Sequence, residues 1–335
     1  MSRTIFKTIR SVAASMLAML LFTTAFTANA QELMRPLEES AKIIAVSFPN
    51  SSTIGAVMTT LDQLKMRGAE NGYEVIVHDP GTDMNKQINT LRTWIQQKVA
   101  VIVAVVPNPK AFEVIAKQAR EAGTIWMTYG ETLENQDATV GFSQEADGRR
   151  LGEYAGDWIT ENLGGKAKVA ILGYDLATWG RLRTKGLKEG LLANAPNVDI
   201  VAEQNAITPS EGLDTTRTIL QAHPDVNVIV GIEDPATEGA YKAWVASGRD
   251  KNQADAFIGG MDGTVPALRL LRAGDNIYRA SMASPLSGFG DGIMEKALEL
   301  LSGTSSGPEY IVPLELVLRG SPRAQFFLDE QGQGE

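Results

Sequence analysis

Short apolar segments alternate with segments of helical periodicity along most of this chain. Ile43–Phe48 is an apolar run typical of a buried strand, and after it apolar residues recur at helical spacing: Ile54, Val57, Met58, Leu61 and Leu64. Further strand-like runs, with helical segments between them, are Tyr73–His78, Ala100–Val106 and Thr124–Tyr129. Because strands and helices alternate, we expect a parallel sheet with helices on both of its faces.

The alternation starts again after residue 166. This second series predicts helices at 180–193 and 285–302, and strands at 167–173, 199–203, 226–231, 256–260 and 276–281. A chain of 335 residues is also too long for one ordinary hydrophobic core and fits about two domains. The predicted fold class is therefore α/β, with two similar doubly wound parallel-sheet lobes. The polar tail, residues 331–335, is expected to be frayed.

The first thirty residues have the pattern of an export signal. Three cations precede an apolar stretch from Val12 to Phe26, and Ala28-Asn29-Ala30 then forms a small-x-small cleavage pattern. A membrane anchor is the alternative, since the apolar part approaches the length that spans a bilayer. The Ser, Thr and Ala residues within it and the cleavage pattern favour removal. We predict a signal peptide over residues 1–30, cleaved after Ala30, and a soluble protein in a Gram-negative periplasm.

Composition excludes several classes of chemistry. The 31 Lys and Arg against 40 Asp and Glu give a formal charge of −9, which argues against nucleic acid as a partner. The absence of Cys removes disulfides, thiolate metal sites, cysteine nucleophiles and a lipoprotein anchor. His78 and His223, the only histidines, are expected to be structural. Phosphate-loop, zinc-protease, EF-hand and serine-hydrolase motifs are missing. We expect no metal, no cofactor and no enzymatic activity.

The residues that follow the predicted strands are the candidates for ligand contact. In an open parallel sheet, ligands bind beyond the carboxyl ends of the strands. The residues at those ends are rich in hydroxyls, carboxylates and aromatic rings, and the predicted ligand-binding set is Ser51, Ser52, Thr53, Asn108, Tyr129, Glu131, Trp179, Arg181, Glu233, Asp262 and Ser284. Trp179 is the preferred flat surface for the C–H edges of a sugar ring. Trp126 and Trp158 are expected to lie in the core instead.

Four segments carry a resemblance to a known family. They are Asn71-Gly-Tyr-Glu-Val75, Ala222-His-Pro-Asp-Val-Asn-Val-Ile-Val-Gly231, Glu233-Asp-Pro-Ala-Thr-Glu-Gly-Ala240 and Gly260-Met-Asp-Gly-Thr264. In these segments and in the order of its elements, the chain resembles the type I periplasmic substrate-binding proteins of sugar ABC transporters, especially the ribose-binding-protein-like group. Bacterial repressors share the fold and these segments, but they carry an N-terminal pair of DNA-binding helices where this chain has its signal peptide.

The resemblance implies a molecule that closes. Lobe 1 would hold residues 31–142 and 285–312, lobe 2 would hold 143–284 and 313–335, and a three-strand hinge would join them. By the same resemblance Arg181, in an Arg-x-Arg spacing with Arg183, would grip neighbouring hydroxyls of a sugar through its rigid fork of donors. Asp262 would accept hydrogen bonds from two hydroxyls.

The chain departs from the family pattern at four places. Gly130-Glu131 stands where the family has an Asp-Arg pair, and Glu233 replaces an asparagine although Asp234 is retained. Ser284 replaces a glutamine at the hinge, and Ser51-Ser52-Thr53 replaces an aromatic pair after the first strand. The predicted pocket therefore has more acceptors and fewer donors than is usual for the family, which suits a polyol or an amino sugar.

The expected function is a monomeric periplasmic receptor that closes over a sugar, a sugar alcohol or a related polyhydroxylated solute and delivers it to an ABC permease. One alternative is a sensor that presents the closed form to a chemotaxis receptor or a histidine kinase. Another is a glycosidase that uses Glu131 with Glu233 or Asp262 as a carboxylate pair. That alternative is weak because every one of these carboxylates is already explained as an acceptor for ligand hydroxyls.

Overall fold

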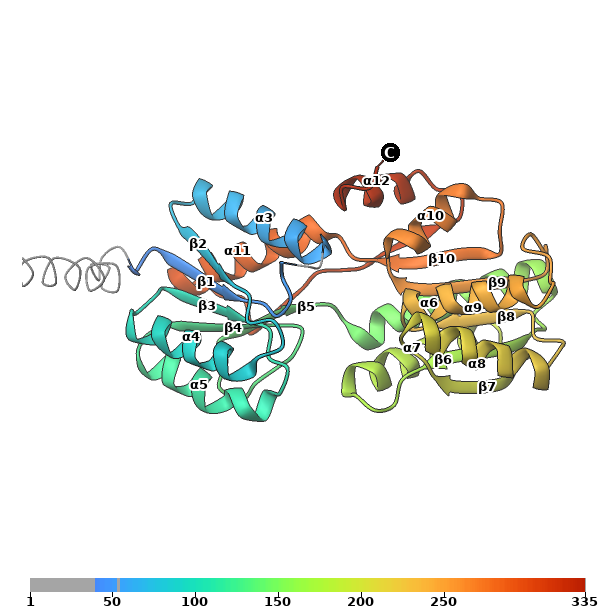
Figure 1. The fold of residues 1–335 in the computed structure, drawn as a ribbon, viewed down its shortest axis with the longest axis horizontal. Coiled ribbons are helices and arrows are strands. Elements are labelled where there is room, and N and C mark those ends of the chain that lie inside the picture. Colours follow the sequence, from blue (N-terminus) through green and yellow to red (C-terminus); the bar gives the residue numbers. More distant parts are fainter. Residues whose placement is uncertain (1–39, 53–54, 335) are drawn as a thin grey trace, which may run out of the picture.

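A computed structural model describes residues 40–52 and 55–334. The predicted signal peptide, its cleavage site and Thr53 lie outside the described residues. Within the described part, the chain forms two six-stranded sheets, each covered by helices, which lie side by side along the longest axis of the molecule (Figure 1). We call each sheet with the helices packed on it a lobe.

The sheet of the first lobe is parallel throughout. Its strand order is β11-β5-β4-β3-β1-β2. The bounds are Ile43–Ser47 for β1, Glu74–His78 for β2, Val101–Ala104 for β3, Ile125–Tyr129 for β4, Ala138–Gly141 for β5 and Glu309–Ile311 for β11. The strand order reverses direction between β1 and β3. This point of reversal is where ligands bind in sheets of this kind.

The sheet of the second lobe repeats this arrangement in the order β12-β10-β9-β8-β6-β7. Its strands are Lys168–Gly173 for β6, Asp199–Asn205 for β7, Val228–Gly231 for β8, Phe257–Asp262 for β9, Tyr278–Ala283 for β10 and Glu315–Leu318 for β12. The strand order reverses between β6 and β8, and β12 pairs antiparallel with β10. The prediction of two similar doubly wound lobes is confirmed.

Helices cover both faces of the first sheet. One face packs on α4 (Met84–Gln96) and α5 (Pro109–Glu121) through Leu91, Trp94, Phe112 and Ile115. The other packs on α3 (Gly55–Glu70) and α11 (Leu286–Ser302) through Leu61, Leu64, Phe289 and Ile293. Trp126 is fully buried within β4, as expected for a core residue.

The second sheet is covered in the same way. On one face lie α6 (Gln144–Leu163) and α7 (Thr178–Asn194), and Trp158 of α6 is buried in the core as expected. On the other lie α8 (Pro209–Ala222), α9 (Asp234–Ala246) and α10 (Val265–Ala273), and α12 (Arg323–Glu330) packs beside α10. His223 ends α8 and His78 ends β2, which are the structural places predicted for them.

The α6–α7 pair is packed backbone to backbone. A Cβ atom added to Gly152 would lie 2.0 Å from the carbonyl oxygen of Leu187, and one added to Gly148 would lie 2.3 Å from that of Arg183. Gly186 and Gly190 on α7 face the backbone of α6 equally closely. Any side chain larger than hydrogen at these positions would force the two helices apart.

Some elements differ from the sequence-based predictions. The strand predictions missed β5, β11 and β12, which have only three or four residues each. The prediction of a frayed tail is wrong for its described part. Gln331 Nε2 donates to the carbonyl oxygen of Gly263 at 2.8 Å, and the N–H of Gln333 donates to that of Leu328 at 2.8 Å.

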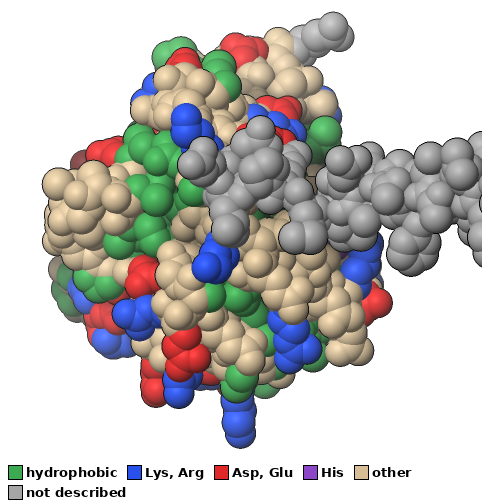
Figure 2. Space-filling model, turned by 90° about the vertical axis from the view of Figure 1, so that its left-hand side faces the viewer, with side chains coloured by type: hydrophobic (Ala, Val, Ile, Leu, Met, Phe, Trp, Pro, Cys, Tyr) green, Lys and Arg blue, Asp and Glu red, His purple; other side chains and the backbone are tan. Residues whose placement is uncertain are grey.

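The chain passes between the two sheets three times, after β5, after β10 and after β11. Figure 1 shows these connections at the centre of the molecule, with α12 above them. At the outer end of the first lobe, basic and acidic side chains are interspersed over the described surface (Figure 2). No helix in the described part is both long and apolar enough to cross a membrane.

Candidate functional site

Arg183 lies at the centre of a polar cluster in the second lobe. Its guanidinium Nη1 donates to Glu233 Oε1 at 2.9 Å, to Asp262 Oδ1 at 3.0 Å and to a backbone carbonyl oxygen at 3.0 Å. Its Nε donates to Gln144 Oε1 at 2.6 Å. The Arg183 side chain is only 3% exposed, so its orientation is set by these four acceptors. The cluster joins α6, α7 and the ends of two strands.

The two carboxylates stand at neighbouring strand ends. Glu233 follows β8 and is the N-cap residue of α9, and Asp262 is the last residue of β9. Asp262 has a φ of 100°, which non-glycine residues rarely adopt, so the backbone is held in a strained turn at this point. Their side chains remain 20% and 27% exposed. Both carboxylates can therefore meet a ligand while they bind Arg183.

Asp234 holds the turn that carries Asp262. It is fully buried and accepts four hydrogen bonds, from the N–H groups of Gly263 and Thr264 at 2.8 and 3.0 Å and from the hydroxyls of Tyr278 and Ser281 at 2.8 and 2.7 Å. Burial and the charge of Asp262 raise the pKa of Asp234, whereas these hydrogen bonds oppose the rise. Asp234 is therefore a structural support beneath the cluster.

The cluster has more acid groups than cations. The pKa of Glu233 is raised to about 10, mainly by burial and then by the charge and hydrogen bond of Asp262. The positive charge of Arg183 acts in the opposite direction. Burial alone would lower the pKa of Arg183, but Asp262 and Glu233 hold it above its ordinary value. These effects favour the protonated form of Glu233, and Arg183 stays charged.

Aromatic rings surround this polar cluster. The guanidinium carbon of Arg183 lies 5.0 Å from the ring centroid of Phe142 and 5.6 Å from that of Trp179. Trp179 stacks on Tyr174 with centroids 5.5 Å apart. In the first lobe, the ring of Tyr129 packs between Phe48 and Phe289. Burial and then the charge of Asp262 raise the pKa of Tyr129, and the two residues line one cavity from opposite lobes.

A cavity of about 580 Å³ lies between the lobes at this point. Residues from both lobes and from the C-terminal tail line it: Tyr129, Phe142, Asp262, Gly263, Thr264, Val265, Ser284, Leu286, Gln331 and Gln333. Its volume falls in the usual range for small-molecule sites. In the described part of the chain, no group of acidic or histidine side chains has the arrangement of a metal site.

The family model for the periplasmic binding protein domain matches residues 44–305, which is more than half of the chain. The chain belongs to the periplasmic binding protein family. The resemblance found from the sequence is thereby confirmed. Proteins of this kind bind solutes and are not enzymes, so the glycosidase alternative is not supported.

Individual relatives of this periplasmic binding protein cover most of its length. A Rhizobium meliloti protein named as a rhizopine-binding protein is 27% identical over 84% of this chain and 95% of its own. A ribose import binding protein of Bacillus subtilis is 26% identical over 79% of this chain and 86% of its own. Each is a solute-binding protein by name.

Solved structures share the fold. A solute-binding protein of Actinobacillus succinogenes with bound D-allose aligns with a TM-score of 0.70 at 20% identity, over 82% of this chain and 96% of its own. One of Bacillus halodurans with bound myo-inositol aligns with a TM-score of 0.70 at 21% identity, over 87% of this chain and 98% of its own.

The structure brings part of the predicted ligand set of this binding protein together. Glu233 and Asp262 meet at Arg183, Trp179 lies against the same guanidinium, and Tyr129 and Ser284 line the cavity. The backbone N–H of Ser284 donates to the carbonyl oxygen of Asp262 at 3.2 Å, which links the ends of β9 and β10.

Other predicted residues have local partners instead. Both the N–H and the hydroxyl of Ser52 donate to Asp79, at 2.9 and 2.5 Å, and Asn108 Oδ1 accepts from the N–H of Ala111 as the N-cap of α5. Ser51 is buried in the turn after β1. The side chain of Glu131 is exposed and does not line the cavity between the lobes.

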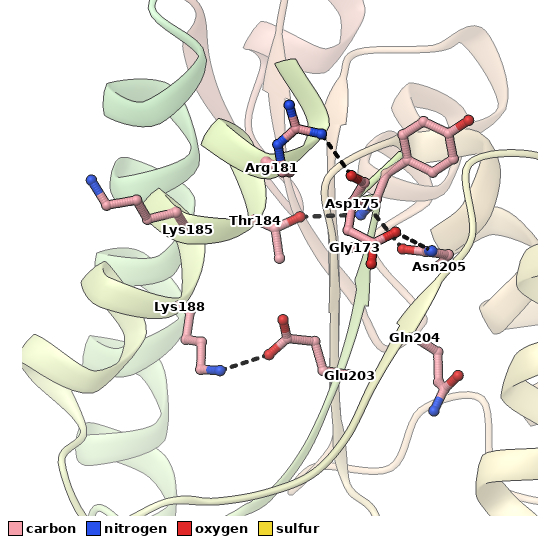
Figure 3. Close-up of a pocket in the computed structure, with 10 residues that line it drawn as sticks. Gly173, Asp175, Arg181, Thr184, Lys185, Lys188, Glu203, Gln204 and Asn205 are labelled. Carbon is pink, nitrogen blue, oxygen red and sulfur yellow. Dashed lines mark hydrogen bonds and ion pairs between the residues drawn. The ribbon is translucent and has the colours of Figure 1, made fainter. Parts of the chain in front are cut away.

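Arg181 does not occupy the place that the sequence suggested for it. It lies on the exposed side of α7, where its guanidinium donates to the carbonyl oxygen of Asp175 and to the hydroxyl of Thr178, both at 2.8 Å. Figure 3 shows it over a different cavity of about 500 Å³, across which Lys188 pairs with Glu203. The arginine between Glu233 and Asp262 is Arg183.

Helical periodicity carries the signal that distinguishes the two arginines. Arg183, Leu187 and Leu191 are spaced four residues apart, which places Arg183 on the same buried face of α7 as the two leucines. Arg181 is two residues away and therefore points about 200° around the helix. Gln331 and Gln333, by contrast, have no sequence signal that could have placed them at the cavity.

Proposed function

We propose that this protein is a receptor that encloses a sugar, a sugar alcohol or a related polyhydroxylated solute between its two lobes and delivers it to an ABC importer. The observation that carries this proposal is the cluster of Arg183, Glu233 and Asp262 beside the cavity between the lobes. The relatives and structural neighbours named above, several of which carry sugars or a polyol in their names, support the same class of solute.

The cluster offers what a polyhydroxylated solute requires. The partly exposed carboxylates of Glu233 and Asp262 are acceptors for hydroxyl groups, and the buried guanidinium of Arg183 holds both carboxylates in place. Trp179 and Tyr129 add flat apolar surfaces for the C–H edges of the solute. Each charged hydrogen bond contributes about 1.5–3 kcal/mol.

The proposal includes the division of the chain and the way it works. Residues 31–142 with 285–312 form one lobe and residues 143–284 with 313–335 form the other, in accord with the sheet to which each strand belongs. The solute bridges the lobes and shifts the equilibrium between open and closed forms toward the closed one. The signal peptide is cleaved after Ala30, and the mature protein acts as a monomer in the periplasm with an inner-membrane permease as its partner.

A binding experiment with paired variants tests the site. The mature protein is first screened by thermal shift against pentoses, hexoses, polyols and amino sugars, because a ligand of the folded form raises its melting temperature. Isothermal titration then compares the wild type with Asp262→Ala and Arg183→Lys. We expect each variant to lose affinity by about ten- to a hundredfold, the equivalent of one charged hydrogen bond.

Arg181→Ala is the matched control, because Arg181 is only two residues away and binds Asp175 and Thr178 instead. We expect its affinity to stay within about twofold of the wild type. Loss of binding in Arg181→Ala with full binding in Arg183→Lys and Asp262→Ala would show that the site lies elsewhere. No response to any polyhydroxylated solute would overturn the proposed function.

A further inference from the structure

The cluster at the cavity holds one cation against an excess of acid groups. Arg183 places the same nitrogen, Nη1, between Glu233 and Asp262, so one positive charge serves two carboxyl groups. Asp234, which is fully buried beside them, accepts hydrogen bonds from four neutral donors. Among the described residues, the structure shows no ion pair between a second cation and any of these three acid groups.

Two ionised carboxyl groups around Arg183 would carry one more negative charge than the guanidinium balances. This excess charge can be neutralised in two ways. One carboxyl group can keep a proton, or a second cation can enter the site. Burial and the nearby charge of Asp262 raise the pKa of Glu233 and so favour the first arrangement. A proton held in this way is readily replaced by a cation of the right size, because both neutralise the same charge.

The walls of the cavity suit a cation as well. Tyr129 and Phe142, one on β4 and the other just after β5, both line the cavity beside Asp262. The face of an aromatic ring attracts an ammonium group, and the attraction grows where water is excluded. Phe142 already stacks on the guanidinium of Arg183, which shows that a cation is accommodated on this wall.

Resting on the proposed function, we propose that the solute is a polyhydroxylated compound that carries a protonated amino group, and that this ammonium group pairs with Glu233 and Asp262 inside the cavity. Its hydroxyls would meet the side-chain amides of Gln331 and Gln333, which line the cavity. The amine distinguishes this class from the neutral sugars and polyols that the proposed function also allows.

The proposal requires a balanced exchange of one proton. The carboxyl group of Glu233 releases its proton to solvent, and the ammonium group of the solute takes its place with its own three protons retained. Arg183 of α7, Asp234 of α9 and Tyr129 of β4 interact electrostatically with Glu233 or Asp262, and Asp147 of α6 interacts with Arg183. Of these, Asp147 also meets Arg150 at 3.5 Å, and none has to change its charge for the exchange.

Matched pairs of neutral and amino compounds test this inference by isothermal titration at pH 6, where the amines are protonated before they bind. The probes are D-glucose with D-glucosamine, D-galactose with D-galactosamine, and myo-inositol with a monoamino-deoxyinositol. In at least one pair we expect the amine to bind tenfold or more tightly than its neutral partner. Titrations in two buffers of different ionisation enthalpy should show the release of close to one proton. Affinity should rise with pH, by up to tenfold per unit, until the amine of the probe loses its own proton.

Glu233→Gln removes the exchangeable proton and keeps the shape of the side chain. We expect it to lose both the preference for the amine and the proton release, and Asp262→Asn serves as a second variant should Glu233→Gln fold poorly. The matched control is Glu121→Gln, at an exposed carboxylate on α5 whose nearest cation is Lys117 at 3.9 Å. This control should retain both properties.

The outcomes separate the two proposals. Tighter binding of an amine with proton release supports the inference. Tighter or equal binding of the neutral partner, without proton release, overturns the inference and leaves the proposed function in place. Binding of neither member of any pair, together with a silent thermal-shift screen, overturns the proposed function and the inference with it.

Discussion

His78 shows how a single residue makes stability depend on pH. It ends β2, where its Nε2 lies 3.2 Å from the hydroxyl of Thr90 and its ring meets the edge of Trp94, while its Nδ1 is buried without a hydrogen-bond partner. Burial and then the charge of Lys86 lower the pKa of His78 below 6.5. The unfolded chain therefore binds a proton more readily than the folded chain does.

We predict that the free energy of unfolding of the wild type, relative to that of a His78→Asn variant, falls as pH drops below about 6.5, through the range in which only unfolded His78 is protonated. Urea denaturation between pH 5 and 7.5 measures this change, and imidazole NMR signals give the pKa directly. His223 is the only other histidine, so a His223→Asn variant assigns the signals and serves as the control. A pKa of His78 above 6.5 in the folded protein would contradict the prediction.

At the scale of residues, the sequence predicts which side chains could bind a ligand better than it predicts where those side chains lie. Glu233, Asp262 and Trp179 were predicted because they follow strands, and they meet at one cluster. Ser52 and Asn108 also follow strands but bind Asp79 and the start of α5. A hydroxyl or an amide at a strand end can serve a ligand or cap a local turn, and only the three-dimensional neighbours decide between the two.

At the scale of elements, the packing of α6 against α7 depends on glycine at the points of closest approach. Gly152 lets α6 approach the backbone of α7, since a Cβ there would lie 2.0 Å from a carbonyl oxygen. Backbone atoms cannot move aside as a flexible side chain can. We predict that Gly152→Ala lowers the free energy of unfolding by about 3 kcal/mol, the upper end of the usual cost of overpacking. Chemical denaturation of the two proteins measures the difference.

Gly288 in α11 provides a matched control. A Cβ added there would lie 3.5 Å from its nearest neighbours, an ordinary van der Waals distance. Because alanine favours a helix over glycine, Gly288→Ala should leave stability unchanged or raise it by up to about 1 kcal/mol. Equal losses in both variants would show that the α6–α7 approach is not the cause.

The C-terminal helix links the two lobes through Glu330. The Oε1 atom of Glu330 accepts from the N–H and the hydroxyl of Ser287 in the first turn of α11, and its carbonyl oxygen accepts from Thr59 in α3 at 3.1 Å. The residue that precedes α11, Pro285, provides no side-chain cap of its own. Glu330 therefore caps a helix of the other lobe.

We predict that Glu330→Ala lowers the free energy of unfolding by about 1 kcal/mol, the usual cost of losing a helix cap. Urea denaturation checks the value. Glu121→Ala removes an exposed carboxylate that meets only Lys117, at 3.9 Å, and should change stability by less than about 0.5 kcal/mol. If Glu330→Ala and this control had the same free energy of unfolding, the cap would not contribute to stability.

Sequence patterns predicted the longer elements and missed the short ones. The long apolar runs and helices each carry enough residues for a period to be recognised. By contrast, β11 has three residues and β12 has four, and each is a strand only because it pairs with β5 or β10 from a distant part of the chain. Pairing of this kind depends on the tertiary fold and leaves no local period to detect.

At the scale of the whole molecule, the repetition of one topology explains where the cavity lies. Both sheets reverse their strand order at the same place, so each lobe offers its own crevice at the carboxyl ends of its strands. The cavity between the lobes takes Tyr129 from one sheet and Asp262 from the other. The two-lobe organisation followed from the sequence because the strand–helix alternation occurs twice.

Closure of the two lobes is the property that the proposed function requires of the whole molecule. A solute that bonds to both lobes stabilises the form in which they are closest, so the molecule becomes more compact when it binds. We predict that the radius of gyration, measured by small-angle X-ray scattering, falls when the wild type is saturated with the solute identified by the thermal-shift screen. Asp262→Ala at the same solute concentration should show a smaller fall, because fewer of its molecules are occupied. An unchanged radius of gyration at proven saturation would mean that the solute binds without drawing the lobes together.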